Sequence, residues 1–247
     1  MADLALLALA DGRTFTGRAF GAPGRAVGEV VFNTSMTGYQ EILTDPSYRG
    51  QIVAMTYPLI GNYGVNPEDS ESRQPHVRGF VVGELCRTPS NFRSQQTLQD
   101  YLSEHEVIGI EGIDTRALTK HLRSAGAMRA CLTTELEKDE AIEAAKASPP
   151  MTGSDFVKEV TTSKPFTWEE ESRRWTVPKP SHGQEDHYHP LPEPLRRIVA
   201  YDFGVKYNIL RQLRQHGFEV QVVGAGTSAR EVLKLNPDGI FLSNGPG

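Results

Sequence analysis

One segment of the sequence is of a type that can bind a negatively charged group through its backbone amides. Residues 243–247 (SNGPG) directly follow the apolar run at 240–242. The two glycines let backbone amides approach a ligand without an intervening Cβ atom, and Pro246 stiffens the turn. Amides presented in this way can stabilise an oxyanion. Taken alone, the pattern is more often an ordinary glycine-rich turn after a strand, so it indicates only a candidate site.

A second candidate is residues 33–41 (NTSMTGYQE), the densest polar run beside an apolar segment. Thr37 and Gln40 have the spacing of a capping box, which predicts that part of this polarity starts a helix. Residues 44–48 (TDPSY) then predict a turn that offers the hydroxyl of Ser47. A solvated turn is the more common meaning of such a pattern.

The two cysteines, Cys86 and Cys131, are both surrounded by apolar residues. Neither lies in a Gly-x-Cys-x-Gly elbow, which would expose a nucleophilic thiolate at a strand-to-helix turn. We therefore expect both thiols to be buried and inert. A count of two excludes a disulfide framework and favours a reducing compartment.

Two further patterns suggest chemistry but are rejected on their context. His182, His187 and His189 lie in a proline-rich stretch without a carboxylate–histidine pairing, so we expect no metal site. Residues 202–204 (DFG) spell a protein-kinase motif, but no glycine-rich loop or His-Arg-Asp segment accompanies them. The residues alone therefore contain no complete catalytic set.

Composition limits the class of protein. The chain has 247 residues, enough for one large or two ordinary domains. It carries 26 Lys and Arg against 31 Asp and Glu, and the net charge of −5 argues against a nucleic-acid partner. Its apolar runs are shorter than the ~18 residues of a membrane helix, and the run at 4–10 does not resemble a signal peptide. We expect a cytoplasmic protein with no membrane partner.

Proline usage marks the clearest boundary along the chain. Eight of the 16 prolines lie in residues 149–194, and proline-rich polar sequence sustains neither a helix nor a central strand. Residues 178–195 are therefore expected to form an exposed linker. We divide the chain into a domain at 1–150, a connecting segment at 151–196 and a second domain at 197–247.

The first domain mixes strands and helices without a regular repeat. The dipeptide at 11–12 (DG) separates two apolar runs and predicts a β-hairpin. Asp114 is expected to cap a helix over 115–123. A capping-box pattern that starts at Thr134 predicts another helix, extending to Ala147. The fold class is therefore α/β or α+β.

The second domain alternates strands and helices. Apolar runs at 198–202, 220–223 and 240–242 predict strands, separated by a helix over 205–215 and another from Ser228 to just before Pro237. This βαβαβ order predicts the start of a doubly wound parallel sheet. Three strands cannot bury both faces of such a sheet, so we expect a truncated domain that is prone to aggregate.

Longer motifs then carry a resemblance to a known family. They are residues 33–48 (NTSMTGYQEILTDPSY), 55–58 (MTYP), 61–62 (GN), 90–93 (SNFR), 112–116 (GIDTR), 155–160 (DFVKEV), 200–204 (AYDFG) and 237–247 (PDGIFLSNGPG). In these motifs the chain resembles the small, glutamine-hydrolysing subunit of carbamoyl-phosphate synthase. The resemblance covers residues 4–148 and 197–247 almost continuously.

The resemblance implies a fold, a partner and an activity. The fold would be a mixed α/β domain specific to the small subunit, followed by the first βαβαβ of a doubly wound class I glutamine amidotransferase domain. In the family, a cysteine activated by a histidine–glutamate pair attacks L-glutamine, and the ammonia travels to the large subunit of a heterodimer. That partner uses ATP, Mg²⁺ and bicarbonate to make carbamoyl phosphate for arginine and pyrimidine synthesis. The small subunit itself would bind no cofactor.

Three site residues carry over from the family. Ser47 matches a serine that contacts bound glutamine, and Gly245 and Gly247 match glycines that hold it, with the Gly245 amide in the oxyanion hole. The family's catalytic cysteine, histidine and glutamate lie downstream of residue 247, so we expect no catalytic residue here and an inactive fragment. The alternatives are a non-catalytic binding module for the large subunit and, against the evidence of the first 150 residues, another class I amidotransferase.

Overall fold

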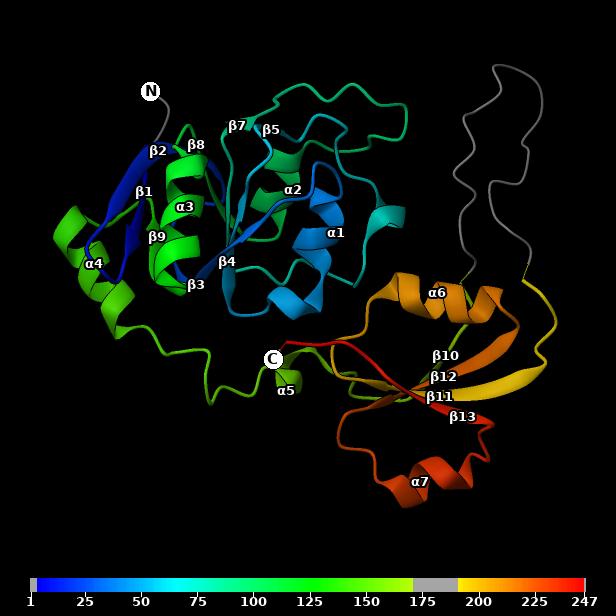
Figure 1. The fold of residues 1–247 in the computed structure, drawn as a ribbon. Helices are drawn as coiled ribbons and strands as arrows, with labels where there is room; N and C mark the ends of the chain where they lie inside the picture. The colour runs from blue at the N-terminus through cyan, green and yellow to red at the C-terminus, as the bar shows by residue number, and fades with distance from the viewer. Residues whose placement is uncertain (1–3, 171–190, 247) are drawn as a thin grey trace. The chain divides into compact units, whose positions relative to one another are not determined.

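The computed structural model describes residues 4–170 and 191–246. The chain divides into two compact units, Met1–Asp155 and Phe156–Gly247, and each is described by itself (Figure 1). Most of the predicted linker at 178–195 lies outside the described residues. The same is true of His182, His187, His189 and Gly247.

The first unit is built on a closed barrel of strands. In order around the barrel they are β1 (Leu4–Leu9), β2 (Thr14–Gly21), β8 (Ile108–Glu111), β6 (Gly79–Val81), β4 (Gln51–Met55), β3 (Arg25–Asn33) and β9 (Met128–Thr133). The hairpin predicted at residues 11–12 is confirmed, because β1 and β2 pair antiparallel around it. Strands β3, β4, β6 and β8 pair in parallel, and β9 closes the barrel against β1.

Helices and short segments surround the barrel. They are α1 (Tyr39–Thr44), η1 (Pro46–Tyr48), η2 (Pro67–Asp69), α2 (Leu98–Glu104), α3 (Thr115–Ala125) and α4 (Lys138–Ala147), with a two-stranded sheet of β5 (Leu59–Ile60) and β7 (Glu84–Leu85). The predicted cap of α3 is confirmed, because the Asp114 carboxylate accepts the Ala117 N–H at 2.8 Å. A core that includes Leu7, Val30 and Ile110 fills the space between the strands and α3.

The start predicted for α4 is wrong by three residues. The helix begins at Lys138, after Glu137, and its cap position makes no side-chain hydrogen bond. The Thr134 hydroxyl is engaged elsewhere, since it accepts the Gly24 N–H at 2.9 Å. The neighbouring Thr133 hydroxyl accepts two N–H groups of the following turn. Both threonines therefore join the end of β9 to the turn before β3 instead of starting the helix.

The second unit contains a four-stranded sheet. In spatial order the strands are β10 (Phe166–Trp168), β12 (Phe218–Gly224), β11 (Arg196–Asp202) and β13 (Gly239–Leu242). Strand β11 pairs in parallel with both β12 and β13, so the predicted βαβαβ order is confirmed. The sequence did not predict β10, which pairs antiparallel with β12 and forms one edge.

The described part of the second unit has three helices, namely α5 (Val157–Val160), α6 (Tyr207–Gln215) and α7 (Ala229–Lys234). Figure 1 shows α6 and α7 on opposite faces of the sheet. Helix α6 begins two residues later than predicted, because the Val205 N–H is bound by the Asp202 side chain in a turn. The predicted capping box of α7 is confirmed between Ser228 and Glu231.

Each face of the second sheet has its own apolar cluster. On one face Trp168 and Ala200 pack with Leu210 of α6, and on the other Val199 packs with Val232 of α7. Within the described part of the chain, no helix has both the length and the apolar character needed to cross a membrane.

Candidate functional site

The glycine-rich loop lies at the carboxyl end of the parallel strands in the second unit. Strands β11 and β13 run in the same direction, so the residues that follow them emerge at one edge of the sheet. The Ser243 N–H donates to the Tyr201 carbonyl oxygen at 3.3 Å, which extends the pairing by one residue beyond β13. Ligands of open α/β sheets bind at this edge. The position of the loop therefore fits a binding site.

A buried carboxylate shapes the turn after β11. Asp202 is only 7% exposed, and its Oδ1 accepts the N–H groups of Gly204 at 2.9 Å and Val205 at 2.8 Å. Gly204 has a φ of 113°, a conformation that glycine adopts without steric cost. The discarded DFG pattern is thus an Asx turn at the end of a strand.

Three hydrogen bonds tie this turn to the glycine-rich loop. The Phe203 N–H donates to the Ser243 hydroxyl at 2.9 Å. The Asn244 side chain donates to the Gly204 carbonyl oxygen at 3.0 Å and accepts the Lys206 N–H at 3.3 Å. The loops after β11 and β13 therefore form one hydrogen-bonded assembly.

Gly245 is required by close packing. A Cβ atom at this position would lie 1.9 Å from the carbonyl oxygen of Phe203, well inside the contact distance of the two atoms. Only glycine lets the loop backbone approach the neighbouring turn this closely. The predicted oxyanion-hole residue therefore belongs to a tightly packed pair of loops.

A segment before β10 joins the same edge. The Thr161 hydroxyl donates to the Asp202 carbonyl oxygen at 2.6 Å and accepts the Ala225 N–H at 2.9 Å, so it links the ends of β11 and β12. The Thr162 N–H donates to Asp202 Oδ2 at 2.7 Å. All three parallel strands are thus connected at their carboxyl ends.

In the first unit, Ser47 lies on a fixed turn. It is half-buried in η1, and its N–H donates to the Asp45 carboxylate at 2.9 Å. The next residue, Tyr48, accepts a hydrogen bond from the Asn33 side chain at 2.9 Å. The turn predicted at 44–48 is therefore a short 3-10 helix whose first turn is capped by Asp45.

The capping box predicted between Thr37 and Gln40 is wrong. Helix α1 begins after Gly38, and the hydroxyl of Tyr63 accepts the N–H groups of Gly38 at 2.6 Å and Tyr39 at 3.0 Å. The Gln40 amide instead binds the backbone of a distant loop. Its Oε1 accepts the Asn66 N–H at 3.0 Å, and its Nε2 donates to the Asn66 carbonyl oxygen.

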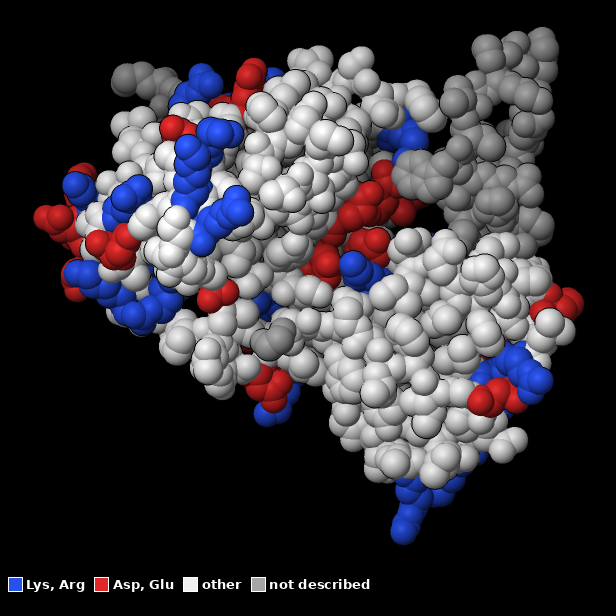
Figure 2. All heavy atoms as spheres, viewed as in Figure 1, with Lys and Arg blue, Asp and Glu red and all other residues white. Residues whose placement is uncertain are grey.

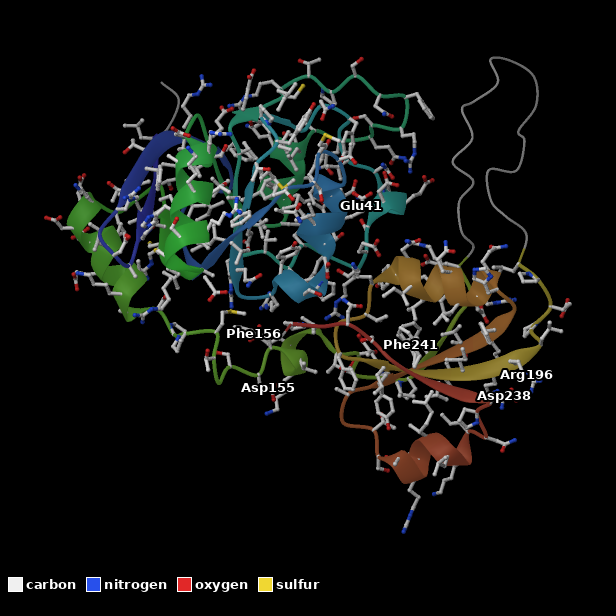
Figure 3. The ribbon with its side chains drawn as sticks, in the orientation of Figure 1. Glu41, Asp155, Phe156, Arg196, Asp238 and Phe241 are labelled. Carbon is white, nitrogen blue, oxygen red and sulfur yellow. The ribbon has the colours of Figure 1, made fainter. Side chains whose placement is uncertain are left out.

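Acidic side chains gather beside α1 (Figure 2). Arg93 pairs with Glu68 at 3.4 Å and with Asp69. Glu41, labelled in Figure 3, has a buried Oε2 with no hydrogen-bond partner among the described residues. Burial, with added repulsion from Asp69 and Glu71, raises the pKa of Glu41 to about 6. This carboxyl belongs to the second candidate segment, residues 33–41.

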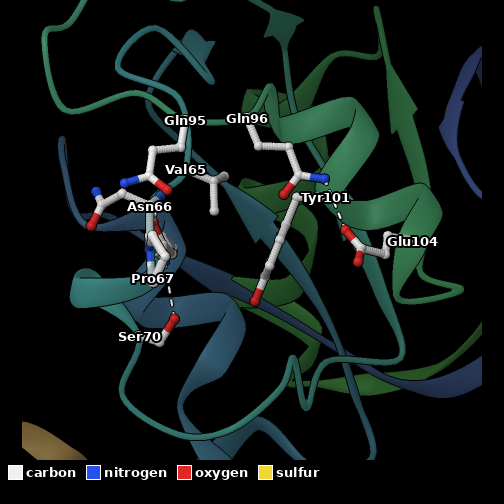
Figure 4. A pocket seen from close by; sticks show the side chains of 9 residues that line it. Val65, Asn66, Pro67, Ser70, Gln95, Gln96, Tyr101 and Glu104 are labelled. Carbon is white, nitrogen blue, oxygen red and sulfur yellow. Dashed lines mark hydrogen bonds between the residues drawn. The ribbon is translucent and has the colours of Figure 1, made fainter.

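A polar cavity of about 450 Å³ lies between the loop at 65–70 and α2 (Figure 4). Its polar side chains largely bind one another, for example Gln96 to Glu104 at 3.0 Å. Burial raises the pKa of Tyr101 to about 12. The sequence did not single out this cavity.

The two cysteines lie in the first unit and differ in burial. Cys131 is fully buried with Ala8, Ala141 and Ala145, and burial raises the pKa of its thiol. The expectation of a buried thiol is therefore confirmed for Cys131. It is wrong in degree for Cys86, which is half-buried and donates from Sγ to a carbonyl oxygen at 3.3 Å. Among residues 4–170 and 191–246, no group of three side chains is placed to ligate a metal ion.

The predicted site residues thus belong to different units of the chain. Ser47 lies in the first unit, Gly245 in the second, and Gly247 lies outside the described residues. Sequence reasoning missed Asp202 and Asn244, which hold the Gly245 loop. The available signal was an Asp-x-Gly pattern directly after a buried strand, which is typical of an Asx turn.

Comparisons with known proteins agree with this division. Residues 7–132 match the family described as carbamoyl-phosphate synthase small chain, CPSase domain, and residues 199–247 match glutamine amidotransferase class-I. Among curated relatives, the carbamoyl phosphate synthase small chain of Akkermansia muciniphila is 60% identical over 243 residues, covering 98% of this chain and 62% of that protein. The protein of the same name from Escherichia coli O6:H1 is 52% identical over 251 residues, covering 100% of this chain and 64% of that protein. The chain therefore spans less than two thirds of the length of these relatives.

Proposed function

Because the chain belongs to the carbamoyl-phosphate synthase small chain family, we propose that it forms the docking and glutamine-cradling part of a subunit that supplies ammonia for carbamoyl phosphate synthesis. The observation that carries the proposal is the loop at residues 243–246. It lies at the carboxyl edge of the sheet, inside the segment that matches class I glutamine amidotransferases.

Each proposed role follows from the chemistry of amide hydrolysis. Attack on the side-chain amide of L-glutamine gives a tetrahedral intermediate, and the Gly245 N–H stabilises its oxyanion. Ser47 donates a hydrogen bond to the bound glutamine, and Gly247 contributes a further backbone contact. The close packing of Gly245 on Phe203 supports this role, because oxyanion donors act only when they are held in place.

The proposed partner is a synthetase large subunit, which uses ATP, Mg²⁺ and bicarbonate and consumes the ammonia. The first unit docks on that partner, in the cytoplasm, and the product enters arginine and pyrimidine synthesis. This chain takes no part in binding ATP or Mg²⁺. The match of residues 7–132 to the small-chain domain supports the choice of partner.

The 247-residue chain alone is proposed not to hydrolyse glutamine. Both of its cysteines lie in the first unit, and the raised pKa of the buried Cys131 thiol opposes formation of a nucleophilic thiolate. Cys86 lacks the exposed position of a nucleophile at a strand-to-helix turn. This favours a binding role for the isolated chain, the second candidate function.

The test combines the purified chain with a purified carbamoyl phosphate synthase large chain. We expect co-elution in size-exclusion chromatography and L-glutamine binding by titration calorimetry, with D-glutamine as control ligand. The Ser47→Ala variant is expected to bind glutamine roughly tenfold more weakly, the loss of about one hydrogen bond, and to co-elute as before. Ammonia release is expected to equal the buffer blank.

Different outcomes separate the candidate functions. Co-elution without any glutamine response would support the non-catalytic binding module. Failure to co-elute, together with no glutamine response, would overturn the proposal. Sustained ammonia release by homogeneous chain, unchanged in a Cys86→Ala/Cys131→Ala variant, would contradict the assignment of the chain as inactive alone.

A further inference from the structure

We propose that Asp202 is a positioning residue for the Gly245 amide, and that the turn at residues 202–204 sets where the oxyanion-hole donor lies. Asp202 is not expected to touch the substrate. The part of this inference that concerns glutamine rests on the proposed function, whereas the part that concerns the position of Gly245 rests on the described residues alone.

The Asp202 carboxylate accepts three backbone N–H groups. Oδ1 accepts the Gly204 and Val205 N–H groups, and Oδ2 accepts the Thr162 N–H. Hydrogen bonds to an ionised carboxylate are about twice as strong as neutral ones. Because the side chain is only 7% exposed, water does not readily replace a lost partner. The Asp202 side chain therefore holds two N–H groups of the turn and one of the segment before β10.

Two hydrogen bonds connect the turn at residues 202–204 to the glycine-rich loop. The Phe203 N–H reaches Ser243 at 2.9 Å, and the Gly204 carbonyl oxygen receives the Asn244 amide at 3.0 Å. Both contacts come from the backbone of the turn, so a change in the backbone of residues 203–204 moves their partners. Gly245 follows directly and packs on the Phe203 carbonyl group.

The backbone of Gly245 is in direct contact with the Phe203 carbonyl group. A Cβ atom there would lie 1.9 Å from Phe203 oxygen, so the two backbones are already in contact. A rotation of the Phe203 peptide would therefore displace Gly245. Since productive active-site geometry tolerates errors of only about 0.5 Å, such a displacement would weaken the interaction with an oxyanion.

Asp238, an exposed aspartate, offers a control within the same unit. Like Asp202, it accepts a backbone N–H, in this case that of Arg197 at 2.8 Å. It lies immediately before β13, at the amino end of the strand, whereas Gly245 follows the carboxyl end. Figure 3 labels Asp238 beside Arg196, with which it forms an ion pair of 3.2 Å.

The experiment uses the full 247-residue chain with selective ¹⁵N labelling and compares Asp202→Asn with Asp238→Asn. We expect Asp202→Asn to shift the Gly245 amide resonance and to speed hydrogen exchange at Phe203 and Val205 at least tenfold. L-glutamine binding should weaken by roughly the same factor. Asp238→Asn should leave the Gly245 resonance, the exchange rates and glutamine binding unchanged.

A second variant guards against unfolding of the Asp202→Asn protein. Ser243→Ala removes the bond from the Phe203 N–H and the bond that the Ser243 hydroxyl donates to the Asn244 carbonyl oxygen at 2.6 Å, and it keeps the Asp202 carboxylate. It should move the Gly245 resonance while the core resonances of Val220 and Val222 stay in place, which a general loss of structure would not allow. An unmoved Gly245 resonance in Ser243→Ala, or in a folded Asp202→Asn protein, would overturn the inference. If the wild-type chain gives no glutamine response but Gly245 moves as expected, the positioning role stands and the proposed function fails.

Discussion

At the scale of single residues, Glu41 is a carboxylate in an unfavourable setting. Burial raises its pKa to about 6 from an ordinary value of 4.5, so the folded state favours the protonated form. A group with a raised pKa stabilises the fold below about pH 4.5, and this contribution is lost as the pH rises to about 6. The ionised side chain then lowers the free energy of unfolding by up to about 2 kcal/mol.

The Glu41→Gln variant should therefore be more stable than the wild-type chain at about pH 7.5 and nearly equal to it at about pH 4. Urea unfolding at both pH values measures the difference. Glu84→Gln, which changes an exposed glutamate, serves as the control and should have little effect at either pH. A gain of equal size at both pH values would show that ionisation of Glu41 is not the cause.

Single residues also show how far the sequence could predict the candidate site. Gly245 was predicted to let the backbone approach a ligand, and the structure shows a close approach of its backbone to the Phe203 carbonyl oxygen. The contact with a ligand stays a prediction. Gln40 was assigned to a local cap, yet its amide binds Asn66, 26 positions away. Local spacing cannot reveal a partner that only the folded chain brings near. The pairing of Asp202 with Thr162 escaped prediction for the same reason.

At the scale of elements, α1 depends on a side chain outside its own sequence. Gly38 has no side chain with which to cap the helix, and Tyr63 supplies the acceptor for two N–H groups. The rings of Tyr39 and Tyr63 also stack at 4.1 Å between their centres. The start of α1 and the stack are thus made by one tyrosine.

The Tyr63→Phe variant removes the acceptor and keeps the stacked ring. We expect the free energy of unfolding to fall by about 1–3 kcal/mol, because two N–H groups lose their partner. Chemical denaturation measures the change, with Tyr57→Phe, at a tyrosine that is 38% exposed, as the control. Equal stability of the two variants would contradict the capping role.

Some helix starts could be predicted from the sequence and others could not. The starts of α3 and α7 were predicted, because Asp114 and Ser228 cap them from within the local sequence. The start of α4 was misplaced, because Thr134 binds Gly24 beside the start of the neighbouring strand β3. Strand β10 was missed because a three-residue edge strand has no clear pattern of its own.

At the scale of the whole molecule, apolar side chains remain at the surface of the second unit. Within the described residues β13 pairs on one side only, with β11, and its Ile240 and Leu242 are 52% and 65% exposed. Leu233 of the neighbouring α7 is 64% exposed. An exposed strand edge with apolar residues favours association between chains.

A double variant, Ile240→Thr with Leu242→Lys, should reduce self-association of the purified chain in sedimentation velocity. The inward-facing Phe241 is left in place, so the core should be kept. Phe92→Ser is the control, because Phe92 is 73% exposed but lies in a loop of the first unit. Association that persists in the double variant and disappears in the control would show that β13 is not the surface through which the chains associate.

The closed barrel of the first unit fixes an order of events during synthesis. Strand β1 pairs with β9, in the register Leu9 to Ala130. The first barrel strand to be synthesised therefore cannot complete its pairing until the last one has been made. At a translation rate of 5–20 residues per second, the hairpin of β1 and β2 waits about 5–22 s on the ribosome before β9 is made. During that time Leu7 and Leu9, fully buried in the finished barrel, have no permanent cover. We therefore expect the nascent chain to be prone to aggregate, and to bind chaperones, until β9 has been made.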